Sequence, residues 1–406
     1  MNADAPIDRR TWMLKTNLEK LPPVLRAGFR PFFFLGPLWA IVVVGLWIAA
    51  MADSVTLPTA FDPLAWHRHE MLFGYLGAII AGFLLTAIPN WTGRLPIAGW
   101  RLAALAVLWI AARVAVLFSA SAGGAVAMLL DVGFLVTLGA ACAREVLIVR
   151  NRNLPVVGVV LLFAIASGVD HAEALGLIAT HGLGWRSGFA LVLVLITLIG
   201  GRIVPSFTRN WLMKQGWTKG LPTQPSRFDF AAIASTVVAL VSWVVEFDPG
   251  ITGLLLLAAG AMQLVRLARW SGHATLAEPL VFILHLAYAW LPIGLLLLGM
   301  SLLVPTQPAS SALHALAAGA MASMTLAVMT RATLGHTGRE LRSDTATTAI
   351  YTLITLGAAL RVASPWLPFD YLLLIRISGA LWGGAFLLFL ASYGPKLLGP
   401  RPDGRP

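Results

Sequence analysis

Histidine side chains gather at the start of one long apolar segment of this sequence. The stretch DPLAWHRHEMLFGYLG, residues 62–77, places His67 and His69 beside Glu70. Neutral imidazole is the commonest nitrogen ligand of haem iron and copper, whereas Mg²⁺ and Mn²⁺ prefer carboxylate oxygens. The stretch therefore indicates haem or transition-metal chemistry, with Glu70 as a candidate proton-handling group.

The spacing of the two histidines predicts that they serve different environments. Asp62 and Pro63 have the residue types of a helix N-cap and a first helical position, so the helix is predicted to begin before His67. At about 100° per residue, His67 and His69 then point to opposite faces and cannot easily hold one metal ion together. We expect His69 to bind the cofactor and His67, with Glu70, to control access, a second metal ion or proton supply.

Other ionisable residues also lie in apolar segments, where such residues usually line a site or a pathway. They are predicted near the same membrane face as the histidine pair, and they are Arg113, Asp131, His171, His314, Arg361 and Arg376. Asp131 joins Glu70 as a candidate catalytic group, the three arginines are candidates for cofactor binding, and the two histidines are candidate metal ligands. A lone intramembrane arginine often pairs with a carbonyl group, so the prediction depends on the convergence of the whole set.

Two further residues leave alternatives open. His285, within FILHLAYAWLP, lies well inside an apolar segment, where cofactor or metal binding and a hydrogen bond to a backbone carbonyl are equally compatible with the sequence. Cys142 is the single cysteine, which excludes an internal disulfide and any CxxC metal site. Packing is favoured over a thiolate haem ligand for this residue.

The composition identifies the elements that must position these residues. The chain has 406 residues, 58% of them hydrophobic and 12% charged, with a mean hydropathy of +0.81, which predicts an all-α integral membrane protein. About twelve spans are predicted near 31–52, 66–89, 100–119, 122–149, 154–173, 184–206, 228–248, 250–271, 277–303, 311–333, 345–365 and 370–392. A turn-rich connection is expected over residues 201–227.

The distribution of basic residues predicts the orientation in the membrane. The net charge is +11, but Lys and Arg alternate by loop and do not form one basic face, which argues against nucleic acid as a partner. They concentrate before the first span and in every second connection, so both termini are predicted to be cytoplasmic. The predicted organisation is a cytoplasmic tail over 1–30, a transmembrane domain over 31–392 and a cytoplasmic tail over 393–406.

Two segments of the chain align without a gap. HEMLFGYLGAIIAGFLLTAIPNWTGR, beginning at His69, matches HALAAGAMASMTLAVMTRATLGHTGR, beginning at His314, and both end in Thr-Gly-Arg. One helix further on, AARVA around Arg113 resembles ALRVA around Arg361, and GGRIVP near Arg202 is a candidate degraded middle copy. The pattern predicts repeated four-helix units, and it leads us to expect His69 to face His314.

These segments resemble the NnrS family of polytopic membrane proteins. The resemblance covers most of the chain and is carried by FRPFFFLGPLWA, DPLAWHRHEMLFGYLGAIIAGFLLTAIPNWTGR, GGRIVPSFTRNW, LHLAYAWL and HALAAGAMASMTLAVMTRATLGHTGREL. It implies a twelve-span protein of the bacterial inner membrane that contains haem, expected to be of b type, and copper, and that is linked to nitric oxide metabolism and nitrosative stress. It also adds the motif histidine His336 to the candidate metal ligands His67, His69, His171, His285 and His314.

The predicted function is therefore a haem-copper membrane protein that binds, detoxifies or reduces nitric oxide in the outer half of the bilayer. A nitric oxide reductase-like activity would require an electron donor in the membrane, which is a further candidate partner. Two alternatives remain: a secondary transporter of a small solute or metal, because such proteins also contain repeats and intramembrane charges, and a sensor or assembly factor for respiratory nitrogen-oxide metabolism.

Overall fold

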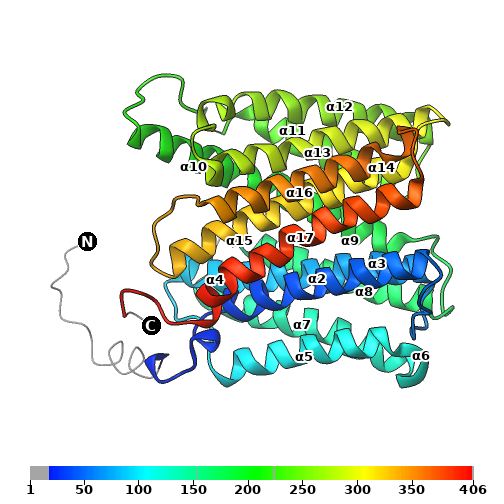
Figure 1. Ribbon diagram of the computed structural model, residues 1–406, viewed down its shortest axis with the longest axis horizontal. Coiled ribbons are helices and arrows are strands. Elements are labelled where there is room, and N and C mark those ends of the chain that lie inside the picture. Colours follow the sequence, from blue (N-terminus) through cyan, green and yellow to red (C-terminus); the bar gives the residue numbers. More distant parts are fainter. Residues whose placement is uncertain (1–17, 152, 223–224, 405–406) are drawn as a thin grey trace.

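The computed structural model describes residues 18–151, 153–222 and 225–404, and over these residues the chain is a bundle of long helices (Figure 1). Twelve helices in this part are long and apolar enough to cross a membrane, which confirms the predicted all-α fold. They are α2 (Phe29–Met51), α3–η2–α4 (Pro63–Thr92), α5 (Trp100–Leu117), α7 (Gly124–Ile148), α8 (Leu154–Ala174), α9–η3–α10 (Leu183–Lys214), α11 (Arg227–Val244), α12 (Pro249–Ala268), α13 (Pro279–Leu303), α14–η5–α15 (Ala309–His336), α16 with its 3₁₀ turn η6 (Thr345–Trp366) and α17 (Tyr371–Leu398). Residues 1–17 of the predicted first tail and 405–406 of the second lie outside the described residues.

Local signals explain where the second span begins. The Asp62 carboxylate accepts hydrogen bonds from the backbone N–H groups of Leu64 (2.9 Å) and Ala65 (3.3 Å), and Pro63 occupies the first turn. The helix therefore begins before His67, as predicted.

The prediction of a turn-rich connection from residue 201 was wrong for its first half. α10 (Gly201–Lys214) continues as a helix through Pro205. The π-helical turn η3 (Ile196–Gly200) directly precedes it. Membrane-spanning helices tolerate proline where such local adjustments satisfy the freed backbone groups, so the helix extends beyond the apolar residues.

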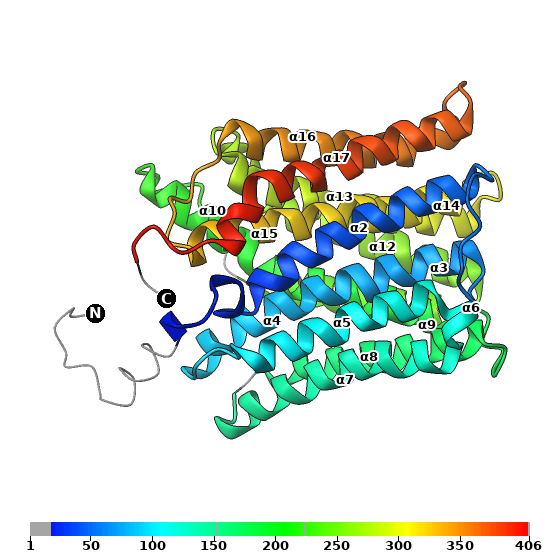
Figure 2. The ribbon, with the colours of Figure 1, turned by 60° about the horizontal axis from the view of Figure 1, so that its bottom comes forward.

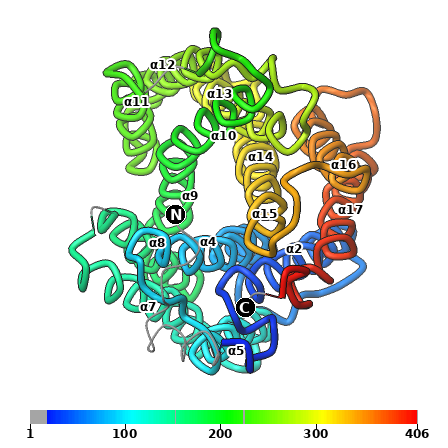
Figure 3. The backbone as a smooth tube through the Cα atoms, turned by 90° about the vertical axis from the view of Figure 1, so that its left-hand side faces the viewer, coloured from blue at the N-terminus to red at the C-terminus, as the bar shows by residue number. Residues whose placement is uncertain are grey.

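The helices form a closed arrangement around three inner spans. α17 packs against both α16 and α2, so the last helix closes the bundle against the first. The most apolar windows of the spans containing α4, α15, α13 and α9 have 72%, 67%, 61% and 56% of their residues buried, against 33% for α2. Of these, α4, α9 and α15 lie around the middle in Figure 3. The first and last described residues lie at one end, which we call the terminal end, and the opposite end is the distal end (Figure 2).

π-Helical turns recur in the three inner spans. η2 (Glu70–Tyr75) begins directly after His69, η5 (Ala315–Met321) begins directly after His314, and η3 lies in the corresponding span between them. The interval of four spans between successive turns supports the predicted four-helix units. π-Turns are uncommon and frequently occur at functional sites, so His69 and His314 are candidate site residues.

Candidate functional site

Ionisable side chains meet at two places at the distal end. The first, which we call the polar cluster, joins α3, η2, α5, α7 and α8; its residues are His69, Glu70, Arg113, Asp131, Ser167, Asp170 and His171, and all are buried. The second, the histidine pocket, is an apolar cavity into which His67 and His314 project. α3 contributes to both sites: His69 belongs to the polar cluster, and His67 belongs to the histidine pocket.

Asp131 lies at the centre of the polar cluster. Its Oδ2 atom is 3.2 Å from the Nε2 atoms of both His69 and His171 and accepts a hydrogen bond of 2.7 Å from the Ser167 hydroxyl. The imidazole rings of the two histidines are 4.5 Å apart, edge to face. One ligand atom from each of His69, Asp131 and His171 lies within 4.8 Å of the other two, so the three residues could hold a single metal ion.

The surroundings of the two histidines also suit metal binding. The Nδ1 atom of His69 is 2.8 Å from Asp170 Oδ2, the partner that commonly orients a metal-bound imidazole and leaves Nε2 free for the metal. The Nδ1 atom of His171 is buried and has no hydrogen-bond partner among the described residues. The donor set therefore fits a transition-metal ion.

The charges of the polar cluster leave one carboxylate uncompensated. Arg113 Nη1 donates to both Glu70 oxygens at 2.7 Å, its Nη2 contacts Asp131, and partly exposed Arg68 lies 3.6 Å from Asp170. Three carboxylates thus face two guanidinium groups. A buried excess charge is costly, and a bound cation would balance it.

Gly74 makes room for the ion pair of Glu70 and Arg113. A Cβ atom at this position would lie 2.5 Å from Arg113 Nη1 and 2.6 Å from Glu70 Oε2. The indole N–H of Trp39 donates to the same Glu70 oxygen at 2.5 Å, and that of Trp109 donates to the Gly74 carbonyl at 3.0 Å. The π-turn η2 therefore carries both the carboxylate and the space in which its partner fits.

The histidine pocket is an apolar cavity with an empty volume of about 850 Å³ that is partly open to its surroundings. Besides the two histidines, Arg361 is the one charged residue of its lining. His314 Nδ1 is 2.7 Å from the Ser310 carbonyl oxygen, which requires the proton on Nδ1 and leaves Nε2 unprotonated. The His67 ring stacks on Trp47 at 5.1 Å, and its Nδ1 atom is buried without a partner in the described residues.

The structure brings most of the predicted site residues to these two places. His69, Glu70, Arg113, Asp131 and His171 lie together in the polar cluster. The prediction that His69 faces His314 was wrong, because His67 shares the pocket with His314. Repeat-related residues occupy equivalent places in their own units: His69 lies near Arg113, and His314 lies near Arg361.

Three predicted residues belong to neither site. Arg376 is on an exposed face of α17. His285 Nε2 is 2.7 Å from the Thr208 hydroxyl, nearer the terminal end, and His336 is exposed at that end of α15. Asp170 was not predicted as a site residue, although a carboxylate beside His171 in an apolar helix meets the same criterion as Asp131.

The fold and the buried histidine and carboxylate groups define a class: a polytopic membrane protein with a candidate metal centre within its helices. The profile of the NnrS protein family matches residues 23–401, so the chain belongs to the NnrS family. Membership confirms the resemblance and fits a membrane protein of the nitric oxide response. Comparison with curated proteins gives no match.

Proposed function

We propose that this protein binds haem in the histidine pocket and a copper ion in the polar cluster, and that it captures nitric oxide at the haem. The observation that carries the proposal is the pair of imidazoles, from His67 and His314, that face one largely apolar cavity. Apolar walls suit a macrocycle, and free imidazole nitrogens suit its iron. Bound haem would supply an iron atom with affinity for nitric oxide.

The residues of the pocket have distinct expected roles. His314 is the better candidate iron ligand, because its bond to the Ser310 carbonyl fixes both the ring and the tautomer. His67 offers a second imidazole that could coordinate or donate a hydrogen bond to a bound molecule. Arg361, half-buried at the cavity wall, has the charge needed to pair with the carboxylates of haem.

The polar cluster is the expected copper site. Two imidazoles and one carboxylate suit a divalent transition metal, and copper binds most tightly among the first-row divalent ions. Reduction of two nitric oxide molecules to nitrous oxide and water would also consume two protons and two electrons. Glu70 is the candidate proton carrier, Asp131 would be a copper ligand, and an electron donor in the membrane would supply the electrons.

The distal end is proposed to face the periplasm. The predicted cytoplasmic loops, rich in Lys and Arg, lie at the terminal end together with the first and last described residues. Nitric oxide is a small neutral molecule, so a site near the outer surface would be supplied directly from the periplasm and from the bilayer.

Separate loss of haem and copper tests this assignment. In purified protein, His67→Ala and His314→Ala should remove or shift the Soret band and leave copper bound, whereas His69→Ala and His171→Ala should remove copper and leave haem. His181→Ala, in a loop at the distal end, is the matched control and should change neither. A colourless wild-type protein after expression with ample haem would refute the proposal and favour the transporter alternative.

A further inference from the structure

A second cavity lies between the three inner spans, and we propose that it is a binding site and passage for small apolar gas molecules. We call it the central cavity. It is lined by residues of α4, α8, α9, η3, α10, η5 and α15. Its proposed role in supplying the histidine pocket rests on the function proposed above, whereas its capacity to hold gas does not.

The chemistry of the lining favours an apolar occupant. Thr325 carries the one polar side chain of the lining, and its hydroxyl is already engaged with the Ala322 carbonyl (2.8 Å) and the Tyr75 hydroxyl (2.5 Å). Water needs two to four polar partners, so an apolar cavity stays dry and accepts solutes such as xenon. Ions and polar solutes are excluded for the same reason.

The size of the cavity suits diatomic molecules. The cavity has an empty volume of about 740 Å³ and is partly open to its surroundings. One water molecule takes up about 30 Å³ in the liquid, so several small molecules fit together.

The cavity lies at the middle of the membrane-spanning segments. Its lining includes residues from Leu76 to Leu84 of the span 63–92, and from Met321 to Val328 of the span 309–336. A neutral apolar gas partitions from water into hydrocarbon, and at this depth the cavity is surrounded by the apolar part of the bilayer. The position therefore matches the region in which such a gas accumulates.

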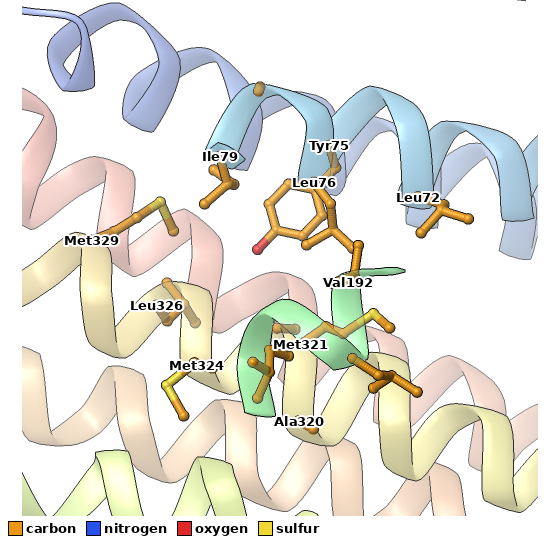
Figure 4. Packing of buried hydrophobic residues seen from close by; sticks show 14 of the residues in the cluster. Leu72, Tyr75, Leu76, Ile79, Val192, Ala320, Met321, Met324, Leu326 and Met329 are labelled. Carbon is orange, nitrogen blue, oxygen red and sulfur yellow. The ribbon is translucent and has the colours of Figure 1, made fainter. Parts of the chain in front are cut away.

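The central cavity adjoins the histidine pocket. Leu76 and Met321 belong to the lining of both, and Figure 4 shows the side chains of Leu76, Val192 and Met321 directed towards one another. Met321 is unbranched and flexible, so rotation of its side chain can open the junction. The hydrogen bond between Tyr75 of the pocket and Thr325 of the cavity holds the two walls together beside this junction.

Filling the central cavity tests the proposal. Val328 lines this cavity and not the histidine pocket, so Val328→Phe should reduce its volume and leave the haem surroundings unchanged. Val238→Phe adds the same ring on an exposed face of α11 and is the matched control. Wild type and the control should bind xenon in the cavity, seen by anomalous diffraction of pressurised crystals, and Val328→Phe should not.

The rate of gas recombination tests the passage. After photolysis of carbon monoxide or nitric oxide from the haem, Val328→Phe should slow recombination from the membrane several-fold, and Met321→Ala should accelerate it. Xenon absent from the wild-type cavity, or an acyl chain that occupies it, would overturn the proposal. Equal recombination rates in all variants would exclude the passage. If the protein contains no haem, the proposed function fails, and xenon binding alone decides whether the cavity is a gas site.

Discussion

His67 and His69 lie two positions apart on α3 and face different sites. His69 is fully buried between Asp131 and Asp170, whereas His67 stacks on Trp47 at the wall of the histidine pocket. One helical turn thereby supplies an imidazole to a charged site and another to an apolar one. Both sites contain a histidine of α3, so a displacement of this helix would move both histidines.

Asp170 is expected to be a positioning residue for the metal site. Asp170→Asn removes the carboxylate that orients His69, and loss of such a partner typically lowers metal affinity roughly 10–100-fold. Titration of the purified apoprotein with copper measures the effect. Asp248→Asn, at the N-cap of α12, is the control, and equal affinities in both variants would show that Asp170 does not orient a ligand.

Arg113 is expected to be essential for stability. Arg113→Met leaves Glu70 and Asp131 buried without their shared cation, and removal of one partner of a buried ion pair costs roughly 3–5 kcal/mol. The melting temperature in detergent should fall, and addition of Glu70→Gln should restore part of the loss. A double variant no more stable than Arg113→Met would contradict the charge argument.

Gly74 is expected to tolerate no side chain. Gly74→Ala forces a methyl group against Arg113 and Glu70, and overpacking of this kind typically costs roughly 1–3 kcal/mol. Gly77→Ala on the same helix is the control, because its nearest neighbour would be Leu135 at 3.6 Å. Thermal unfolding should separate the two variants, and similar melting temperatures would show that the ion pair can move aside.

Asp344 is expected to give acid sensitivity to the start of α16. Hydrogen bonds from the Thr347 hydroxyl (2.6 Å) and backbone N–H (2.7 Å) lower the pKa of this N-cap carboxyl. Its contribution to stability is therefore present above the unfolded-state pKa, about 4, and is lost as the pH falls through the lower folded-state pKa. Asp344→Asn should flatten the decline of melting temperature in this acidic range, and parallel curves for variant and wild type would contradict the assignment.

The membrane orientation can be measured with reporter fusions. A periplasm-specific reporter inserted after Gly176, in the connection between α8 and α9, should be active, and the same reporter after Pro406 should be inactive. The reverse result would place the polar cluster and the histidine pocket in the cytoplasmic half of the membrane.

The fold was predictable because lipid imposes simple rules on sequence. Long apolar runs identified the spans, and the residue types of Asp62 and Pro63 identified a helix start. The π-turns after His69 and His314 were not predicted, because apolar spacing does not distinguish one extra residue per turn. The extension of α10 beyond residue 206, to Lys214, was missed because the predicted span ended with its apolar run, whereas the helix continues into more polar sequence.

The sequence predicted which residues belong to the candidate site better than it predicted which residues contact one another. Buried charge in apolar helices identified Arg113, Asp131 and His171, and α-helical geometry correctly separated His67 from His69. The partner of each histidine depends on how the repeated units are arranged in space. Alignment shows which residues are equivalent, and equivalent residues meet only when they lie near the axis that relates the units.

The closure of α17 against α2 implies an order of assembly during synthesis. Every residue of the polar cluster lies in the first five spans, so the ribosome has completed this site when α8 emerges. The histidine pocket also needs His314, Arg361 and Trp382, and its last wall arrives with the final span. The residues of the proposed metal site are therefore in place long before those of the proposed haem site, and insertion of α17 is the step that completes the histidine pocket.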